Sequence, residues 1–387
     1  MKKKIFLKEK ISYIWGILFL VVVIGFAFLS GIRLIWFYTT NQINYNERTE
    51  AAQTAFEADY MANFYGKKQF INIHGGISNV LGQRQLNGVT KLNNGYLVTL
   101  MEPVAEEKVT QEAAQAKKLK DEFEKNGIDF LYVMTPYTVN KYDTQLPLGM
   151  QDVGNQNADK VLEEMKANGI NCLDIREKIY ESGMNHYDLM YKTDHHWNEK
   201  GGFFAYQQIA KSVEKQLDIE WNPKYQDINN YETVTYEAWH LGSNGQRTGI
   251  MYAGIDDFSF LLPKFDTCLQ REGTLGDFKE IFICEDALQK TDYNSRYTYD
   301  TTFDTIGHFI NENAENSIKA VLVCDSMGRA MIPYLALSMK ELKVLDAYSI
   351  SNISLQTVEE YQPDIVIFMH YPGIYEYGNL FVLGEES

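Results

Sequence analysis

The feature that most constrains the fold is a regular alternation of helical patterns and short apolar strands in the middle of the chain. The helical patterns lie at Glu106–Lys125 and Gln156–Ala167, and the strand-like runs at Ile128–Met134 and Ile170–Asp174. Gly127 and Gly169 follow the two helices, where left-handed C-caps form. Strands that alternate with helices form right-handed βαβ crossovers. The pattern therefore predicts an α/β fold with a mostly parallel sheet, covered by helices on both faces as a three-layer sandwich.

The same rhythm returns near the C-terminus. We expect strands at Ala320–Cys324, Val344–Leu345 and Asp364–Met369, and helices at Asp325–Lys340 and Leu355–Tyr361. From about 218 to 316 the alternation of helices and strands stops, and short strands, aromatic residues and loops follow. We interpret this stretch as an irregular insertion between two halves of one sheet. Upstream, Asn94-Gly95 between apolar runs predicts a β-hairpin near the start of the main domain.

An uncharged apolar run near the N-terminus, Ile11–Leu29, is long enough to cross the ~30 Å hydrocarbon layer of a membrane as a helix. The first ten residues hold five lysines and one glutamate, whereas the whole chain carries a net charge of −16. The positive-inside rule then places the N-terminus in the cytoplasm and the acidic body outside the cell membrane. A cleaved signal peptide is the alternative, but no Ala-x-Ala pattern lies near Leu29, so we prefer a single-pass anchor.

These observations divide the chain into three parts. Residues 1–38 form the cytoplasmic tip and membrane anchor, with Trp36, Phe37 and Tyr38 marking the interface. Residues 39–85 form a juxtamembrane tether, which includes a helical pattern at Asn46–Phe56. Residues 86–387 form the main domain, which holds the candidate catalytic residues described below. The acidic balance argues against nucleic acid as a partner, because neutralising phosphates requires clustered Lys and Arg.

The four cysteines lie outside the membrane in this topology, where disulfides are chemically allowed. Cys268 and Cys284 are close enough in sequence to pair, and their pairing stays open. Cys172 and Cys324 each lie in an apolar strand-like run and are expected to be small buried residues. No Cys or His spacing indicates a zinc site.

Ser326 stands where α/β enzymes carry functional side chains, directly after a predicted parallel strand and at the start of a helix. There its hydroxyl would face the cleft, and helix N–H groups would be free to bind a developing oxyanion. The simpler alternative is that Ser326 only caps the helix, which is the commoner reason for serine at this position.

A serine nucleophile needs a base, and the base needs an orienting acid. The segment Asp194-His195-His196-Trp197 supplies both. In an extended chain residues i and i+2 project to one side, so Asp194 would address His196 while His195 points away as a structural residue. Asn198 is expected to cap a helix that follows, and Gly201 and Gly202 to allow close backbone approach.

Another interpretation of the same segment is a site for a hard metal ion, built from its acidic and histidine side chains. The residues concerned are His186, Asp188, Asp194, His195 and His196. A second carboxylate cluster on a neighbouring strand end is missing from the sequence pattern. We therefore expect no metal and no organic cofactor.

Asp194-His195-His196-Trp197 followed by Asp325-Ser326 resembles the bacterial DHHW family. That family is similar to the alginate O-acetyltransferases of the AlgJ and AlgX type in the SGNH hydrolase-like superfamily. The resemblance covers most of the body, roughly Asn46 to Phe368. It implies Ser326 as nucleophile, His196 as general base and Asp194 as orienting acid, in an order permuted relative to ordinary SGNH esterases. One departure is Cys324, which stands where the acetyltransferases have glycine.

The sequence and the resemblance together predict a membrane-anchored, extracytoplasmic serine O-acyltransferase or esterase acting on cell-envelope or secreted polysaccharide. The resemblance also implies a membrane-bound acyl-transfer partner. Arg329, Trp197, Trp239 and Arg247 are the candidate substrate-binding residues, and the glycine-rich segment Gly242–Gly249 is expected to form a loop over the cleft. The alternatives are a non-catalytic glycan-binding or assembly protein on the same fold, and a metal hydrolase.

Overall fold

The computed structural model describes residues 2–41, 57–61, 64–288, 307–352 and 355–384. The chain divides into two compact units, Met1–Ile77 and Ser78–Ser387. The helical pattern expected at Asn46–Phe56 lies outside the described residues.

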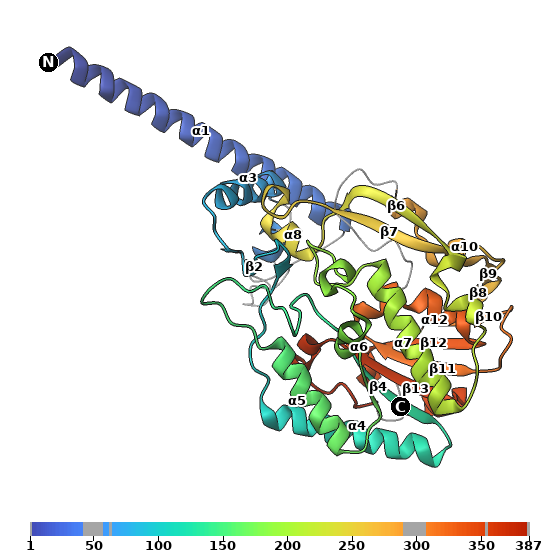
Figure 1. Cartoon of the computed structure of the whole chain (residues 1–387). Helices are drawn as coiled ribbons and strands as arrows, with labels where there is room; N and C mark the ends of the chain where they lie inside the picture. The colour runs from blue at the N-terminus through green and yellow to red at the C-terminus, as the bar shows by residue number, and fades with distance from the viewer. Residues whose placement is uncertain (1, 42–56, 62–63, 289–306, 353–354, 385–387) are drawn as a thin grey trace. The chain divides into compact units, whose positions relative to one another are not determined.

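An eight-stranded sheet forms the centre of the second unit (Figure 1), with the spatial order β5-β4-β13-β11-β12-β10-β8-β9. Its parallel strands are β4 (Asp129–Met134), β5 (Cys172–Asp174), β11 (Lys319–Cys324), β12 (Glu341–Asp346) and β13 (Ile365–His370). Its antiparallel strands are β8 (Leu269–Arg271), β9 (Thr274–Gly276) and β10 (Gly307–Asn311). The predicted mostly parallel sheet is thus confirmed, and β13 from the C-terminal part lies between β11 and β4, the latter from the middle of the chain.

Alternation of apolar side chains along the strands builds one core on each face of the sheet. In β4, Leu131 and Val133 face the core that contains α7 (Glu199–Leu217) and α12 (Ile332–Ser338). Phe130 and Tyr132 face the core that contains α4 (Glu106–Lys125), α5 (Gly154–Ala167) and α13 (Leu355–Tyr361). Successive side chains of a strand point to opposite faces, so helices cover both sides and give the three-layer arrangement.

Several predicted helix ends are confirmed. Helix α4 runs from Glu106 to Lys125, and Gly127 and Gly169 adopt φ of 74° and 72° after their helices. Asn198 caps α7 by accepting hydrogen bonds from the N–H groups of Lys200 and Gly201. Such caps satisfy donors that the first helical turn leaves without partners.

The helix predicted from Asp325 to Lys340 is interrupted. It begins as a 3₁₀ turn, η4 (Ser326–Ala330), and the α-helix α12 starts only at Ile332. Pro333 lies in the first turn of α12. Proline lacks an N–H donor and is accepted mainly in a first helical turn, which explains the break.

Residues 218–316 contribute both to the sheet and to a separate ribbon. Strands β6 (Tyr231–His240) and β7 (Asp256–Pro263) pair as a two-stranded antiparallel ribbon, whereas β8, β9 and β10 extend the main sheet. The segment Gly242–Gly249, expected as a loop, contains the short helix α8 (Ser243–Thr248), followed by α9 (Ile250–Ala253). The Gly245 N–H donates to the Thr193 carbonyl at 2.8 Å, and the Thr248 hydroxyl donates to the Asn244 carbonyl at 2.8 Å, so the segment is tied down as a helix.

The predicted hairpin is present in a small sheet of β1 (Gln85–Leu86), β2 (Val89–Lys91) and β3 (Leu97–Val98). Gly95 has φ of 87° in the turn between β2 and β3, a backbone conformation that favours glycine. The remaining short helices are α6 (Ile175–Ser182), α10 (Phe278–Phe282), α11 (Glu285–Leu288), η1 (His186–Leu189), η2 (Pro223–Tyr225), η3 (Ile228–Asn230), η5 (Ala347–Asn352) and η6 (Pro372–Glu376).

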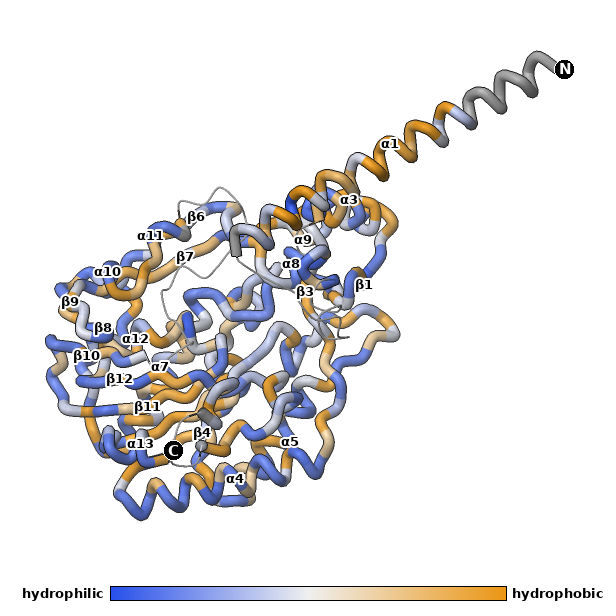
Figure 2. The backbone as a smooth tube through the Cα atoms, turned by 180° about the vertical axis from the view of Figure 1, so that it is seen from behind, coloured by the Kyte–Doolittle hydropathy of each residue, from blue (hydrophilic) through white to orange (hydrophobic). Residues whose placement is uncertain are grey.

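In the first unit, α1 (Lys2–Asn41) contains a segment, Tyr13–Thr39, that is long and apolar enough to cross a membrane. Figure 2 shows this helix coloured as apolar over much of its length. By the same criteria a signal sequence would also qualify, so orientation and anchoring rest on further argument. Helix α3 (Lys67–Val80) belongs largely to the same unit. All four cysteines are free thiols, of which Cys324 is buried and the other three are partly exposed.

Candidate functional site

Ser326 lies at the carboxyl edge of the parallel strands, directly after Asp325 and two residues beyond the end of β11. The Asp325 carboxylate accepts hydrogen bonds from the Met327 N–H at 2.9 Å and from the Tyr371 N–H at 2.7 Å. It therefore fixes the serine turn to the segment that follows the neighbouring strand β13. A Cβ on Gly328 would lie 2.5 Å from the Cys324 sulfur. Cys324, which departs from the family pattern, is accommodated because residue 328 is glycine.

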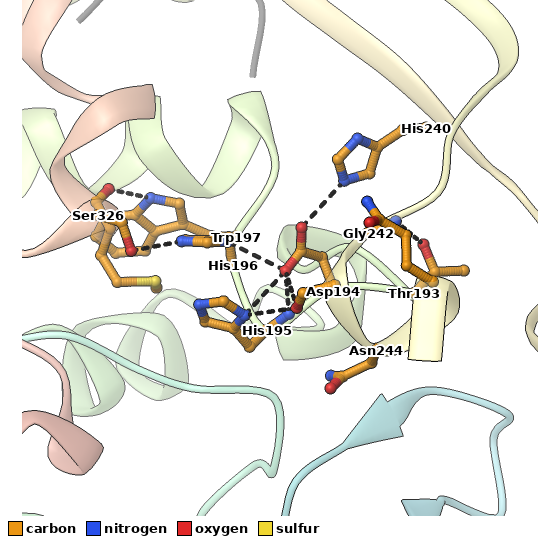
Figure 3. Close-up of polar contacts among 12 residues, drawn as sticks. Thr193, Asp194, His195, His196, Trp197, His240, Gly242, Asn244 and Ser326 are labelled. Carbon is orange, nitrogen blue, oxygen red and sulfur yellow. Dashed lines mark hydrogen bonds and ion pairs between the residues drawn. The ribbon is translucent and has the colours of Figure 1, made fainter. Parts of the chain in front are cut away.

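His196 lies between Ser326 and Asp194 (Figure 3). Its Nε2 is 2.7 Å from the Ser326 Oγ, and its Nδ1 is 3.1 Å from Asp194 Oδ1. Both His196 and Asp194 are buried, and Ser326 is partly exposed. The three side chains form a continuous hydrogen-bonded chain that ends at a hydroxyl within reach of solvent.

Two packing contacts hold the histidine segment against the serine turn. The indole Nε1–H of Trp197 donates to the Met327 carbonyl at 2.8 Å. A Cβ on Gly202, in the first turn of α7, would lie 2.6 Å from the Ala330 carbonyl oxygen. Only glycine allows this approach of α7 to η4. The expected close contact at Gly202 is confirmed, and it sets the position of His196 relative to Ser326.

The carboxylate of Asp194 is surrounded by donors. Its Oδ1 accepts the His195 backbone N–H at 2.7 Å and the Ser243 hydroxyl at 3.1 Å, and it lies 3.0 Å from His195 Nδ1. Its Oδ2 lies 3.3 Å from Nε2 of His240, a buried residue at the end of β6. These donors compensate for the burial of an ionised carboxylate.

The expectation that His195 points away from the acid is wrong. Its backbone N–H bonds to the Asp194 side chain, which curls the segment so that the His195 ring also faces the carboxylate. The rings of His195 and His196 have centroids 3.8 Å apart. The segment is therefore not extended, and the alternation of side-chain directions does not apply.

Gly242 and Asp256, both from the irregular stretch after α7, hold this segment in place. Asp256 accepts hydrogen bonds from the Thr193 hydroxyl at 2.6 Å and the Thr193 N–H at 2.8 Å. The Gly242 N–H donates to the same hydroxyl at 2.9 Å, and a Cβ on Gly242 would lie 2.3 Å from the Asp194 Cβ. The backbone before α8 thus packs directly on the acid.

The electrostatics keep His196 neutral and Asp194 ionised near neutral pH. Burial, followed by the nearby His195, lowers the pKa of His196 to about 4. Burial alone would raise the pKa of Asp194, but attraction to His196 and the histidine hydrogen bonds outweigh it and hold this pKa well below the usual range. A neutral imidazole with a free Nε2 lone pair beside a hydroxyl is the form that accepts a proton.

The structure separates the residues of the metal interpretation. Asp194, His195 and His196 each offer one ligand atom, and these atoms lie within 4.8 Å of one another. His186 is instead buried with Nε2 3.0 Å from the Tyr137 carbonyl, and burial lowers its pKa to about 4. Three ligand atoms are the number that a catalytic zinc site uses.

The four candidate substrate-binding residues lie in different surroundings. Trp197 is only 1% exposed, so its ring belongs to the core and offers no face to a substrate. Trp239 is partly buried and packs against Phe258 with ring centroids 5.8 Å apart. Arg247 on α8 donates to Thr99 Oγ1 at 2.9 Å and to the Asn87 carbonyl at 2.8 Å. Arg329 alone of the four lies on the turn that carries Ser326.

His240, Ser243 and Asp256 belong to the site, and the sequence interpretation missed all three. They are single polar residues in an irregular, aromatic-rich stretch, which carries no spacing signal. The one available signal was Gly242, because it lies between His240 and Ser243, two residues whose side chains hydrogen-bond to Asp194.

Residues 96–273 match the family model described as the SGNH hydrolase-like domain of the acetyltransferase AlgX. This part of the chain is similar to an AlgX-type SGNH hydrolase-like domain. The matched region includes Asp194, His196 and His240 and ends before Ser326. The resemblance found in the sequence is thereby confirmed at the level of the family.

Solved structures support the same fold. PatB1 from Bacillus cereus superimposes with a TM-score of 0.62 at 22% identity, covering 74% of this chain and 96% of PatB1. A structure of PatB1 with a sulfonyl adduct gives a TM-score of 0.61 at 20% identity, over 77% of this chain and all of that one. A DHHW family protein from Eubacterium siraeum gives 0.58 at 16% identity, over 78% and 98% of the two chains. No curated protein matches the chain.

Proposed function

We propose that this protein is a membrane-anchored, extracytoplasmic serine O-acyltransferase or esterase that acts on cell-envelope or secreted polysaccharide. The observation that carries the proposal is the chain of contacts from Asp194 through His196 to Ser326, at 3.1 and 2.7 Å. The similarity to the AlgX acetyltransferase domain supports acetyl as the acyl group. The resemblance of the sequence motifs to alginate O-acetyltransferases supports polysaccharide as the substrate class.

In the proposed first step the Ser326 oxygen attacks the carbonyl carbon of an acyl donor while His196 Nε2 takes the hydroxyl proton. The tetrahedral intermediate collapses, the bond to the donor oxygen breaks, and the protonated His196 gives its proton to that leaving oxygen. A sugar hydroxyl or water then attacks the acyl-enzyme, with His196 again accepting and returning one proton. Asp194 holds the imidazole tautomer and stabilises the imidazolium.

The backbone N–H of Ser326 is the proposed oxyanion donor. In the same turn the Met327 N–H already donates to the Asp325 carboxylate, and the Gly328 N–H donates to the Asp325 carbonyl at 3.0 Å. Both are engaged within the protein, which favours the Ser326 N–H as the donor to the substrate. Removing a single such donor from an enzyme costs roughly 10²–10³-fold in kcat.

The location follows from α1. Its apolar segment Tyr13–Thr39 follows a lysine-rich tip, which favours a cytoplasmic N-terminus and an extracytoplasmic catalytic domain. On that side of the membrane there is no supply of acetyl-CoA. We therefore place a membrane-bound acyl-transfer partner before this protein in the reaction sequence.

The test is hydrolysis of p-nitrophenyl acetate by the full chain, comparing wild type with Ser326→Ala and His196→Ala. Each substitution is expected to lower kcat by at least ~10³-fold, as in other serine triads. Ser349→Ala is the matched control, because Ser349 lies in η5 beyond β12 at the same sheet edge and bonds to Asp346 at 2.9 Å. A sulfonyl fluoride should modify wild type at Ser326. Equal rates in all four proteins would refute the enzyme proposal and favour a glycan-binding protein.

A metal hydrolase is the second candidate, and the Asp194-His195-His196 cluster favours it. Its prediction is the opposite one. Activity would survive Ser326→Ala and disappear with a chelator.

A further inference from the structure

Helix α3 presents its apolar side chains outward. Phe70, Ile73 and Ile77 are 48%, 56% and 56% exposed. With 3.6 residues per turn these three side chains lie within about 60° of one another on the helix. Gly75 and Gly76, on other sides of the helix, are buried. This pattern is the reverse of a surface helix in a soluble protein, which turns its apolar stripe inward.

The start of α3 packs against the apolar segment of α1. The Phe70 ring lies 5.1 Å from the Phe26 ring, centroid to centroid, and the Phe64 ring lies 6.5 Å from it. The Tyr65 N–H donates to the Ser30 hydroxyl at 3.0 Å. All of these contacts are within the unit Met1–Ile77. The outward stripe of α3 therefore begins beside the candidate membrane span.

The positions of the charged residues in α1 indicate how deep in a bilayer this contact would lie. Between Lys10 and Arg33 the helix carries no charged residue, and residues 11–32 are about 33 Å long as a helix, close to the ~30 Å hydrocarbon layer. Phe26 comes seven residues before Arg33, so it lies about 10 Å below the level of that charge. Helices that lie in a membrane interface bury their apolar face ~5–10 Å deep. The depth of Phe26 matches the depth such a helix reaches.

We propose that α3 lies in the outer interface of the lipid bilayer, with Phe70, Ile73 and Ile77 at the acyl-chain boundary, Lys67 near lipid phosphates and Lys68 on the side that faces water. This inference rests on the proposed membrane span in α1. It adds that the segment between the span and the catalytic domain lies on the membrane surface. A lipid surface fits better than a second copy of the chain, because Lys67 is exposed about 60° from Phe70 at the edge of the stripe and anionic headgroups attract such a residue.

The experiment uses the full chain in lipid nanodiscs with single spin labels. The partly exposed native thiols are first replaced by Cys172→Ser, Cys268→Ser and Cys284→Ser, and buried Cys324 is kept. Labels are then placed by Ile73→Cys on the stripe, Lys68→Cys on the polar side, and Val21→Cys within the span. Collisions with oxygen, which concentrates in lipid, and with a nickel chelate, which stays in water, report the depth of each label.

The expected result is a deep position for the Val21→Cys label, an interfacial position for Ile73→Cys, and an aqueous one for Lys68→Cys. A deep Val21→Cys label with equally aqueous labels at 73 and 68 would overturn the inference and leave the span intact. An aqueous Val21→Cys label would overturn both. Spin–spin broadening at position 73 in discs that hold two chains would show a second copy on the stripe, and would also overturn the inference. Hydrolysis of p-nitrophenyl acetate checks that each labelled protein is folded, since none of these residues lies in the proposed catalytic site.

Discussion

His240 should position the acid of the proposed triad, and replacing it tests that role sharply. Asp194 Oδ1 accepts several hydrogen bonds, whereas Oδ2 faces His240 Nε2 at 3.3 Å. His240→Phe removes the donor but keeps a flat ring, which preserves packing against Tyr191, 4.5 Å away, and Phe258. His240→Gln is the matched control, because its side-chain nitrogen can donate from nearly the same place.

The size of the effect follows from the length of the bond. A hydrogen bond to a charged group contributes ~1.5–3 kcal/mol, and at 3.3 Å the lower end applies. About 1.4 kcal/mol corresponds to a tenfold change in rate. We therefore expect His240→Phe to lose about tenfold in kcat/KM, and His240→Gln to recover most of the loss. Asp194 should also bind a proton more readily in His240→Phe, because a donor to its ionised form is gone.

The assay is the pH profile of kcat/KM for p-nitrophenyl acetate hydrolysis, with thermal unfolding measured in parallel. The acid limb of the profile should move to higher pH in His240→Phe and stay near its wild-type position in His240→Gln. A purely structural residue would lower the melting temperature without moving the limb. Equal losses in the two variants with an unmoved limb would refute the reasoning, as would full activity in both.

Three other outcomes test the site. Burial lowers the pKa of His196 to about 4, so its neutral form persists well below the 6.5 of an ordinary histidine. The acid limb of the wild-type profile should therefore fall near pH 4, and a limb at 6.5 would contradict this. Gly242→Ala places a Cβ 2.3 Å from the Asp194 Cβ; it should cost ~1–3 kcal/mol of unfolding free energy and lower kcat/KM, and a variant with unchanged melting and rate would show that the backbone yields. EDTA dialysis should leave activity unchanged, whereas a loss restored by added zinc would support the metal hydrolase.

Local signals made much of the fold predictable. The bounds of α4, the caps at Gly127 and Asn198 and the hairpin at Gly95 each depend on a few neighbouring residues. The place of β8–β10 in the main sheet does not depend on such neighbouring residues. Strand β10 gains its position by pairing antiparallel with β12, some thirty residues away, and β8 has only three residues. Such pairing is decided by tertiary contacts that no local pattern records.

In the site, too, some residues could be predicted from the sequence and others could not. Asp194 and His196 were predictable as an acid and base two residues apart, and Ser326 as a residue after a strand; their contact is present, and their catalytic roles remain predictions. The direction of His240 was not predictable. The pairing register of β6 shifts between Tyr236 and His240, and Ala238 adopts φ of 47°. A bulge of this kind changes the direction of the side chains that follow it, and here it turns His240 toward the acid.

The order of the motifs along the chain matters little, because the carboxyl ends of parallel strands meet at one edge whatever their sequence order. The acid and base follow β5, and the nucleophile follows β11, which is separated from β5 by the two strands β4 and β13. The acid–base segment and the serine turn are held in place by different residues. His240, Ser243 and Gly242 contact Asp194, and Asp325 accepts hydrogen bonds that fix the serine turn. Two contacts join the acid–base segment to the serine turn: the Trp197 indole donates to the Met327 carbonyl, and Gly202 packs against Ala330. Ser326→Ala disturbs neither contact, so a loss of activity in that variant reports chemistry rather than a displaced base.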